Sequence, residues 1–475
     1  MPLPTIPSGN VASQIPTGYD VTNSCLFEEA VMHKTPSSEG DTQKMTLSMW
    51  IKRQEIGVEN QIWHTQNSSN QATSLVFAST DKLLFVADDS NKLVTTRVFR
   101  DRNAWYHICL AIDTTQGTAG NRAKLYINGV QETAFDTESQ PSEDQNLQWN
   151  KTTSHRIGSQ ADTANNAFNG YLAEVVWIDG TQYAASDFGE FDSDSPTIWK
   201  PKDVSGLTFG TNGFYLDFED SSNLGNDANG GTDLTEVSIA ATDQATDTPT
   251  NNFCTLNPLA PYGISGTTWS EGNLNLYHLQ DSGVPCNFFV NKGKWYWENK
   301  IGAESDAQYT AMGIVSESVV ASGDMSDASY AGGFTDYGGD DLAYAYQGAN
   351  GHLLTNDALS SGWGDTYAAN DIISVALDLD NNKLYFAKNG TWQNSGDPTS
   401  GATGTGAVSI TNTYYTPLIQ SFSGSSTNAR LNFGGGCSWT VSSANSDADG
   451  GGTTFEYAPP SGYFALCTKN LANYG

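Results

Sequence analysis

The residues with the spacing for acid–base chemistry lie in one short acidic stretch. Glu190, Asp192 and Asp194 alternate in GEFDSD, and on a β-strand this spacing would place the three carboxylates on one face. Two carboxyl groups about 5 Å apart are what a retaining glycosidase needs. The flanking sequence lacks the alternation of a half-buried strand and soon reaches a proline. It is more typical of a turn or short helix with solvated carboxylates, so we predict no catalysis there.

A second acidic pair gives no better catalytic candidate. Asp217 and Glu219 lie in FYLDFEDSS, on the polar side of a strand whose other side is apolar, and we predict an exposed strand face. The nucleophile-elbow, HExxH and P-loop patterns do not occur in the sequence. The histidines are isolated, and His107 is predicted to be a hydrogen-bonded structural residue. The sequence therefore predicts a protein that is not an enzyme.

Charge and length limit the partners and the architecture. The chain has 475 residues, with 53 acidic against 22 basic side chains and a formal charge of −31. This length exceeds what one core usually holds, so we expect two domains. So acidic a surface repels phosphate backbones and anionic lipid, and neither nucleic acid nor membrane is an expected partner. We predict no signal peptide and no bilayer-spanning segment.

The cysteines predict neither a disulfide scaffold nor a zinc site. They are thinly spread and form no CxxC pair. We expect them to be mostly reduced and buried, and the pair to test for a bridge is Cys437 and Cys467. All six are Cys25, Cys109, Cys254, Cys286, Cys437 and Cys467.

One phrase occurs twice and predicts the same hairpin in each half. KLYINGV (124–130) and KLYFAKNG (383–390) each follow an alternating strand and a polar turn. Asn128-Gly129 and Asn389-Gly390 supply the positive-φ pair that a type I′ turn requires. With abundant glycine and aromatics, and without long amphipathic periods, the composition predicts an all-β protein.

The flanks of the two phrases resemble two different families. Around the first, MTLSMWIKR, AWYHICLAID, HRIGSQ and FNGYLAEVVWIDG resemble, in order, the laminin-G-like group of concanavalin A-like lectin domains. Around the second, GKWYWENKI, YTAMGIVSE, YYTPLIQSFSG and ARLNFGG resemble the core strands of a SPRY domain. Both families are jelly-roll-like antiparallel β-sandwiches. The resemblance implies two tandem sandwiches, which we place at residues 25–217 and 253–475.

The remaining segments are predicted to be connections. Residues 1–24 contain several prolines and are predicted to be an extended N-terminal arm that docks on a neighbour. Residues 218–252, rich in Gly, Asp and Thr, are predicted to be a linker, although the preceding GFYLDF alternates like a strand.

A third resemblance covers nearly the whole chain. WKPKDVSGLTFGTNGFYLDF, TDTPTNNFCTLNP and PPSGYFALCTKNL, with the two domains in this order, resemble laminin-G-like plus SPRY proteins of tailed bacteriophages, notably marine ones. The resemblance implies a virion protein made in the host cytoplasm: a tail or head fibre, a spike or a capsid decoration. It also implies a homo-oligomer that contacts other virion proteins, with the arm as the expected contact.

The resemblance also directs the search for a binding site. Trp363 in SSGWGDTY and Tyr337 in FTDYGGDD lie in loop-like contexts where the SPRY family places its binding surface, and we predict them as ligand-binding residues. Laminin-G-like domains often bind calcium, and DYGGDD (336–341) and SDADGGG (446–452) supply oxygens. The alternative is that these residues only shape turns. We therefore predict no cofactor and name no calcium ligand.

Three functions remain open at this point. The first is a phage appendage that recognises a host-surface glycan or protein through loops on a rigid sandwich. The second is a purely structural decoration or connector subunit, because a lectin-like fold alone does not prove ligand binding. The third, a carbohydrate-active enzyme, is disfavoured because no credible acid pair is present.

Overall fold

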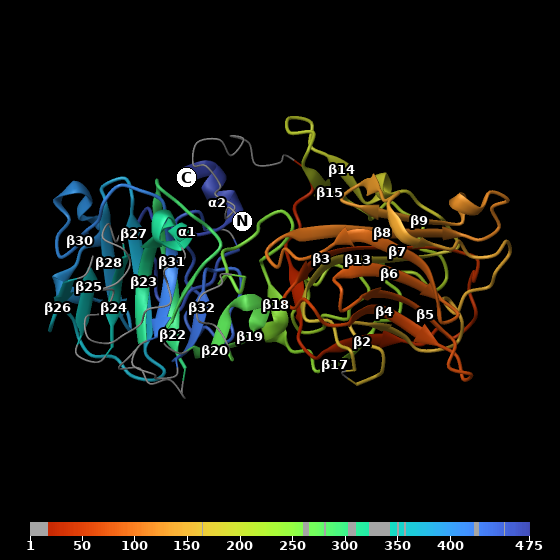
Figure 1. The fold of residues 1–475 in the computed structure, drawn as a ribbon, viewed down its shortest axis with the longest axis horizontal. Coiled ribbons are helices and arrows are strands. Elements are labelled where there is room, and N and C mark those ends of the chain that lie inside the picture. The colour runs from red at the N-terminus through yellow and green to blue at the C-terminus, as the bar shows by residue number, and fades with distance from the viewer. Residues whose placement is uncertain are drawn as a thin grey trace. The chain divides into compact units, whose positions relative to one another are not determined.

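The computed structural model shows two tandem β-sandwiches. It describes residues 18–163, 165–259, 266–279, 282–302, 310–322, 343–348, 351–355, 358–421, 427–450 and 452–475. One compact unit ends at Thr250 and the other begins at Asn251 (Figure 1). Within the described residues the strands are almost all antiparallel and the only α-helices are α1 (Glu317–Ser322) and α2 (Thr468–Tyr474). The all-β prediction is confirmed.

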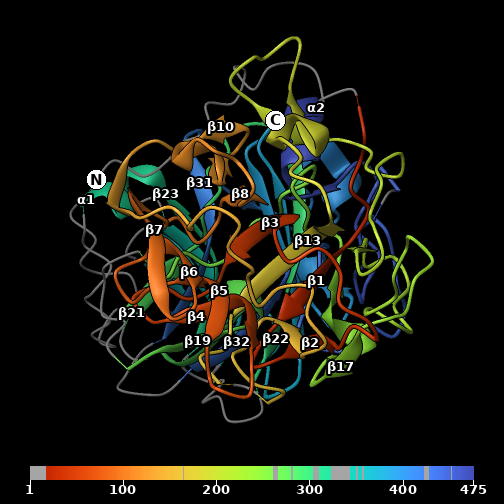
Figure 2. The same cartoon turned by 90° about the vertical axis from the view of Figure 1, so that its right-hand side faces the viewer.

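The first sandwich is built from two large sheets. One, which we call the covered sheet, has the order β10-β9-β8-β3-β13-β1-β18, with β16 paired to β13. Figure 2 shows its central strands β3, β13 and β1 side by side. Its strands are β1 (Ser24–Phe27), β3 (Lys44–Arg53), β8 (Trp105–Asp113), β9 (Ala123–Ile127), β10 (Val130–Gln131), β13 (Gly170–Asp179), β16 (Phe214–Leu216) and β18 (Gln244–Ala245).

The second sheet of this sandwich, the open sheet, has the order β11-β7-β6-β5-β4-β12-β2-β17. Along β6 every second residue is only half-buried, as expected of a sheet with one solvent-facing side. Its strands are β2 (Val31–Lys34), β4 (Asn60–Gln66), β5 (Ala72–Phe77), β6 (Lys82–Ala87), β7 (Ser90–Val98), β11 (Phe135–Glu138), β12 (His155–Ile157) and β17 (Thr235–Val237).

Aromatic side chains fill the space between these two sheets. Trp63 on β4 stacks on Trp177 of β13, with ring centroids 4.6 Å apart, and meets Trp149 edge-on at 6.5 Å. All three are essentially inaccessible to solvent. Such pairs add about 0.5–1.5 kcal/mol beyond the burial of their area, so this contact fixes the two sheets against each other.

The covered sheet is buried on both faces, which its sequence pattern did not predict. In β8 the inner residues Ile108 and Leu110 join the core, as their alternation indicated. His107 and Cys109, on the other face, are also fully buried. The cause is the chain that follows β13, which folds back over this face and packs residues such as Phe188 against it.

Residues 218–252 differ from the linker predicted for them. Within this segment β17 pairs with β2 and β18 pairs with β1, so it adds an edge strand to each sheet. Leu224 and Leu234 join the core of the first sandwich. A loop-like composition did not reveal these strands because they are only three and two residues long.

The described part of the predicted arm belongs to the first sandwich. Val21 is buried against Trp50 and Ala173 on the outer face of the covered sheet, and its N–H donates to Thr250 Oγ1 at 3.1 Å. Residues 1–17, where the docking arm is predicted, lie outside the described residues.

The second sandwich repeats the two-sheet plan. One sheet has the path β19-β20-β32-β22-β27-β28-β29, with β30 on β28 and β33 on β22, and the other has the order β21-β31-β23-β24-β25-β26. The strands of the first are β19 (Thr268–Ser270), β20 (Asn275–Leu279), β22 (Lys294–Ile301), β27 (Ile372–Asp378), β28 (Lys383–Lys388), β29 (Thr391–Trp392), β30 (Val408–Ser409), β32 (Thr427–Asn432) and β33 (Phe464–Ala465). Those of the second are β21 (Ser282–Pro285), β23 (Thr310–Ser316), β24 (Ala343–Gln347), β25 (His352–Thr355), β26 (Ala358–Ser360) and β31 (Tyr415–Ser421).

The repeated phrase forms the same hairpin in both sandwiches. The φ angles are 48° and 77° at Asn128-Gly129 and 47° and 78° at Asn389-Gly390, all positive as predicted for a type I′ turn. Each asparagine side chain also accepts a backbone N–H of the neighbouring strand at 2.8 Å. The Asn-Gly pair therefore sets both the turn and its attachment to the sheet.

Each turn glycine also lies against an aromatic side chain. A Cβ added at Gly129 would come within 2.2 Å of the Trp199 ring, and one added at Gly390 would come within 2.6 Å of the Tyr457 ring. Gly57 has a similar φ of 77° but no neighbour within 4 Å of an added Cβ.

The first prediction separates backbone strain from close packing. Gly57→Ala should lower the free energy of unfolding by about 1–2 kcal/mol, the usual penalty of left-handed backbone for an L-residue. Gly129→Ala should cost about 1–3 kcal/mol more, because the Trp199 ring must also move. Urea unfolding of the full chain measures both, and equal losses would contradict the packing contribution.

Candidate functional site

The acidic stretch at residues 190–194 enters the turn of a hairpin: Glu190 lies on a short strand, while Asp192 and Asp194 lie in the turn, as predicted. β14 (Gly189–Phe191) pairs with β15 (Trp199–Pro201). Glu190 and Asp192 both lie 3.4 Å from Nζ of Lys200, a lysine buried in the hairpin. The backbone amide of Ser195, then that of Asp194, and Lys200 lower the pKa of Asp192. Since these carboxylates hold one lysine in place, the hairpin offers no acid for glycoside cleavage.

The second acidic pair lies at a turn after β16. Asp217 is half-buried and accepts the N–H of Glu219 at 3.1 Å, while Glu219 is exposed. Burial raises the pKa of Asp217, and among the described residues no Lys, Arg or His forms an ion pair with it. The two residues therefore follow the strand and shape a turn, and they do not form the exposed strand face that was predicted.

Two buried glutamates have strongly raised pKa values, but both are closed off from solvent. Glu174 on β13 accepts the hydroxyl of Tyr215 at 2.8 Å, and burial raises its pKa to about 8. Glu298 on β22 accepts the backbone N–H groups of Tyr457 and Glu456 at 2.7 and 2.9 Å, and burial raises its pKa to about 7. Glu174 joins two strands of the covered sheet, and Glu298 ties the segment of residues 456–457 to β22.

His107 has the predicted structural role. Its Nε2 lies 2.9 Å from Ser48 Oγ, and its ring lies between the rings of Trp50 and Trp199. Complete burial lowers the pKa of His107 to about 3, so the ring stays neutral. Solvent cannot reach this Ser–His contact, which therefore stabilises the covered face and offers no nucleophile.

The structure describes only one of the two aromatic residues that were predicted to bind a ligand. Trp363 is half-buried and meets Tyr346 and Phe386 edge-on, with ring centroids 5.6 and 5.9 Å away. Much of its ring is therefore occupied by the core. Tyr337 lies outside the described residues. Trp50, Trp295 and Trp297 are buried and Trp105 packs against a core cluster, as predicted.

The described part of the second Gly-Asp stretch is held by protein donors. Asp447 accepts from the N–H of Ala465 at 2.8 Å and from Asn470 Nδ2 at 2.9 Å. Among the described residues no group of three His, Cys, Asp or Glu side chains is placed to hold a metal ion. Residues 336–341 lie outside the described residues.

All six cysteines are free thiols, including Cys437 and Cys467, and five of them are buried. Burial raises the pKa of Cys467 to about 12. In the described part of the chain, no helix is long and apolar enough to cross a membrane.

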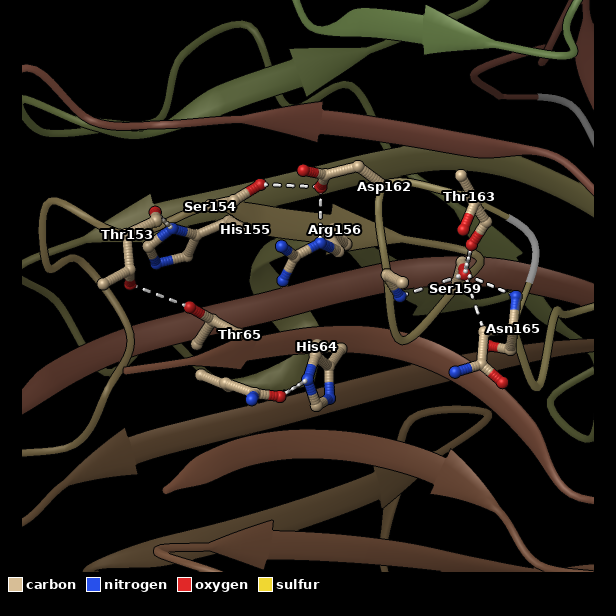
Figure 3. Close-up of polar contacts among 12 residues, drawn as sticks. His64, Thr65, Thr153, Ser154, His155, Arg156, Ser159, Asp162, Thr163 and Asn165 are labelled. Atoms are coloured by element: carbon tan, nitrogen blue, oxygen red, sulfur yellow. Dashed lines mark hydrogen bonds and ion pairs between the residues drawn. The ribbon is translucent and has the colours of Figure 1, made fainter. Parts of the chain in front are cut away.

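A row of polar side chains crosses the outer face of the open sheet, and Figure 3 shows two of them, His64 and Arg156. Arg156 on β12 lies opposite His33 on β2 and His64 on β4, and His64 lies opposite Ser74 on β5. Residues next to them in sequence, such as Ile157 and Trp63, enter the core. By strand alternation, these four side chains share the face that points away from the core.

Hydrogen bonds of Ser159 hold several residues of the loop after β12 beside this row. Ser159 is fully buried, and its hydroxyl contacts the carbonyls of Thr163 and Asn165 at 2.7 and 3.3 Å. The same Oγ lies 3.1–3.2 Å from the N–H groups of Ala161 and Asn165. Figure 3 shows Asp162 on this loop, directed at Arg156.

Arg156 is held through its Nε atom, and Asp162 is held through its Oδ1 atom. Arg156 Nε donates to Asp162 Oδ1 at 2.6 Å, and the same oxygen accepts Ser154 Oγ at 3.2 Å. The side chains keep 16% and 52% of their surface exposed. Among the described residues, Arg156 Nη1, Arg156 Nη2 and Asp162 Oδ2 make no hydrogen bond within the protein. The pair thus presents fixed donors and a fixed acceptor, side by side, to solvent.

His64 is fixed as a neutral neighbour of this pair. Its Nε2 donates to Gln66 Oε1 at 3.2 Å, so Nδ1 accepts the hydroxyl of Ser74 at 2.8 Å. Burial, reinforced by the charge of Arg156, lowers the pKa of His64. We call His33, His64, Ser74, Arg156 and Asp162 the open-sheet cluster.

Sequence analysis did not find this cluster. Its members come from four strands and one loop that are far apart in the sequence. The only local signal is HRIGSQADT, in which Arg156 alternates with two inward residues and is followed by a polar loop.

The architecture defines a tandem β-sandwich protein, and comparisons with known proteins specify the two domains. Residues 30–185 match a laminin-G-type model described as the concanavalin A-like lectin/glucanases superfamily, and residues 294–415 match the SPRY domain model. The chain therefore carries a concanavalin A-like domain followed by a SPRY domain. Both are domain types of binding proteins.

Solved structures are similar only at low identity. The SPRY domain of human HERC1 is 13% identical, with 35% of this chain and 91% of that chain covered and a TM-score of 0.25. A Bacteroides ovatus protein assigned to carbohydrate binding is 16% identical, with 47% and 60% covered and a TM-score of 0.33. A heptameric SAP-like pentraxin of Limulus polyphemus is 16% identical, with 35% and 80% covered and a TM-score of 0.26. No curated protein matches the chain.

The second prediction concerns the pH dependence of stability. The pKa of Glu174 rises from 4.5 to about 8 on folding, so the folded chain retains a proton that the unfolded chain loses between these values. The associated stability is present below pH 4.5 and is lost as the pH rises through 8. Glu174→Gln keeps the neutral shape and should remove this dependence, which amounts to at most about 5 kcal/mol.

Urea unfolding of the wild type and the variant at pH 5, 7 and 9 measures the difference. The other titrating groups are shared, so the gap between the two profiles reports Glu174 alone. The variant should gain stability relative to the wild type as the pH rises. Parallel profiles would contradict the assignment.

Proposed function

We propose that the protein is a non-catalytic virion protein of a tailed bacteriophage, exposed as a fibre, spike or capsid-surface subunit, and that it recognises the host surface. The order of a concanavalin A-like domain and a SPRY domain supports this proposal. The three phrases that resemble phage proteins lie outside both matched ranges, so they support the proposal independently. The formal charge of −31 is compatible with a particle surface in salt water, where screening limits self-repulsion.

The observation that carries the recognition role is the open-sheet cluster. Arg156 keeps 16% and Asp162 keeps 52% of the side-chain surface exposed, so both members of the ion pair retain accessible atoms. Polar groups that are oriented by a rigid scaffold and still accessible are what a binding site requires. We therefore propose that the first sandwich takes part in recognition, and we favour this role over that of a purely structural decoration or connector subunit.

The proposal assigns the remaining chain to assembly. The N-terminal arm contacts other virion proteins, and the protein forms a homo-oligomer. The enzyme alternative predicts sugar release that depends on Glu190. Since Glu190 is paired with Lys200, we expect no such activity.

The third prediction locates the protein. Antibody raised against residues 251–475 and coupled to gold should label particles from a lysate of the source, at tail tips, at projecting fibres or on the capsid surface. Label confined to free material would contradict the virion proposal.

A cell-binding measurement separates recognition from a purely structural role. The isolated full chain, labelled with a fluorophore, should bind host cells and should not bind unrelated bacteria. Labelled particles combined with no cell binding would favour a decoration or connector subunit. Sugar release that is lost in Glu190→Gln would instead restore the enzyme alternative.

A further inference from the structure

We propose that Lys300, Arg430 and Trp439 bind a doubly charged tetrahedral oxyanion, sulfate or phosphate, on an outer face of the second sandwich. The site lies on the sheet that contains β20, β32 and β22, which are neighbours in that order. The inference goes beyond the proposed function and does not depend on it.

Two cations are direct neighbours across strands of this sheet. Lys300 on β22 lies opposite Arg430 on β32, and Arg430 lies opposite Asn275 on β20. Ala429 and Leu431, on either side of Arg430, enter the core. By strand alternation, Lys300, Arg430 and Asn275 therefore form a row on the outer face. In such a pair the Cβ atoms are about 5 Å apart, so one small anion can contact both cations.

No carboxylate balances this pair of charges. Most arginines in the described part of the chain form an ion pair with an acidic side chain. Lys300 and Arg430 are both half-buried, yet among the described residues neither forms an ion pair or a side-chain hydrogen bond. Like charges directly opposite each other destabilise a sheet. A bound anion would convert this repulsion into attraction.

Two acidic side chains lie in the neighbourhood but do not pair with the row. Burial raises the pKa of the Cys437 thiol to about 12, Glu298 and Glu271 add to the increase, and Lys300 opposes it. Neither carboxyl group forms an ion pair with Lys300 or Arg430. Glu298 instead accepts the backbone N–H groups of residues 456 and 457 at 2.9 and 2.7 Å.

The segment that follows β32 crosses the row and adds another donor. Ser438 Oγ donates to Asn275 Oδ1 at 2.6 Å, and Lys300 Nζ lies 5.8 Å from the centre of the Trp439 ring. The segment therefore runs from β20 to β22 across Arg430.

Two buried N–H groups in this segment and row have no acceptor in the protein. Trp439 is 7% exposed, and neither its Nε1 nor Nε of Arg430 makes a hydrogen bond among the described residues. Such groups are costly to bury unsatisfied, and the protein supplies no oxygen for them. An oxyanion held between Lys300 and Arg430 would supply one.

The charge of the row favours a small dianion. Lys300 and Arg430 together carry two positive charges, which sulfate balances at any physiological pH and a phosphate group nearly balances at pH 7. The guanidinium group binds two oxygens of such an anion, and the ammonium group acts as a point charge. Because the whole chain carries −31, an extended polyanion would be repelled by the rest of the surface.

Equilibrium dialysis of the full chain against radiolabelled sulfate or phosphate measures binding directly. Ionic strength is kept constant with sodium chloride. The wild type should bind about one anion per chain, and Arg430→Gln and Lys300→Gln should each bind it roughly tenfold or more weakly.

Lys388→Gln is the matched control. Lys388 lies on β28 of the same sheet and forms an ion pair with Asp371 at 3.3 Å. This variant loses the same charge as Lys300→Gln but should bind sulfate within about twofold of the wild type.

Urea unfolding separates a binding role from a structural one. Without sulfate or phosphate, Arg430→Gln should be at least as stable as the wild type, because the repulsion from Lys300 is removed. Sulfate stabilises folded proteins in general, so the variant provides the baseline. Added sulfate should raise the unfolding midpoint of the wild type more than that of the variant. Destabilisation by Arg430→Gln that is the same with and without sulfate would contradict the site.

The remaining outcomes concern the anion and its source. Nitrate, a monoanion, should compete poorly with labelled sulfate, and equal competition would overturn the choice of a dianion. No sulfate or phosphate binding, or equal binding by Arg430→Gln, would overturn the site whether or not the chain binds host cells. If sulfate displaces the wild type from host cells, the oxyanion belongs to the host surface. If dialysis detects binding and host-cell binding is unaffected, the ligand is the dissolved ion.

Discussion

Each sandwich depends on a carboxyl group buried on the outer face of a sheet. Glu174 is 5% exposed and Glu298 is fully buried. A buried carboxyl needs hydrogen-bond donors. Tyr215 on the neighbouring strand β16 donates to Glu174, and the amides of residues 456 and 457 donate to Glu298. The outer face around Glu174 is covered by the chain that follows β13, and Phe455 packs on Tyr296 of β22 beside Glu298.

The two sheets of the first sandwich differ in how their outer polar side chains are used. The covered sheet uses its outer polar residues internally, as the contact between Ser48 and His107 shows. The open sheet uses His64 and Ser74 in a similar contact, but Arg156 and Asp162 beside them keep exposed atoms. The cross-strand contact between His64 and Ser74 is buried like that between Ser48 and His107, and on the open sheet only the neighbouring Arg156 and Asp162 keep exposed atoms.

Local features of the fold could be predicted from the sequence, and long-range ones could not. Asn-Gly turns depend on two adjacent residues, so both hairpins and the positive φ angles of their turns were predicted. Burial of the second face of β8 depends on a segment about 80 residues later, and periodicity carries no information about it. The open-sheet cluster has the same difficulty: the register that brings His33, Arg156 and His64 together is set by pairing between distant strands.

The repeated architecture does not repeat the site. In the second sandwich the six-stranded sheet carries small and apolar residues on its outer face, and Val319 and Val320 of α1 pack against Ala311, Ala345 and Leu418. A polar row like that of Arg156 would lie buried there beneath the helix, at a high desolvation cost. The hairpins preserve the frame in both halves because their contacts are local, while the outer faces are free to differ. The outer face of this sheet, as far as the structure describes it, therefore has no counterpart of the open-sheet cluster.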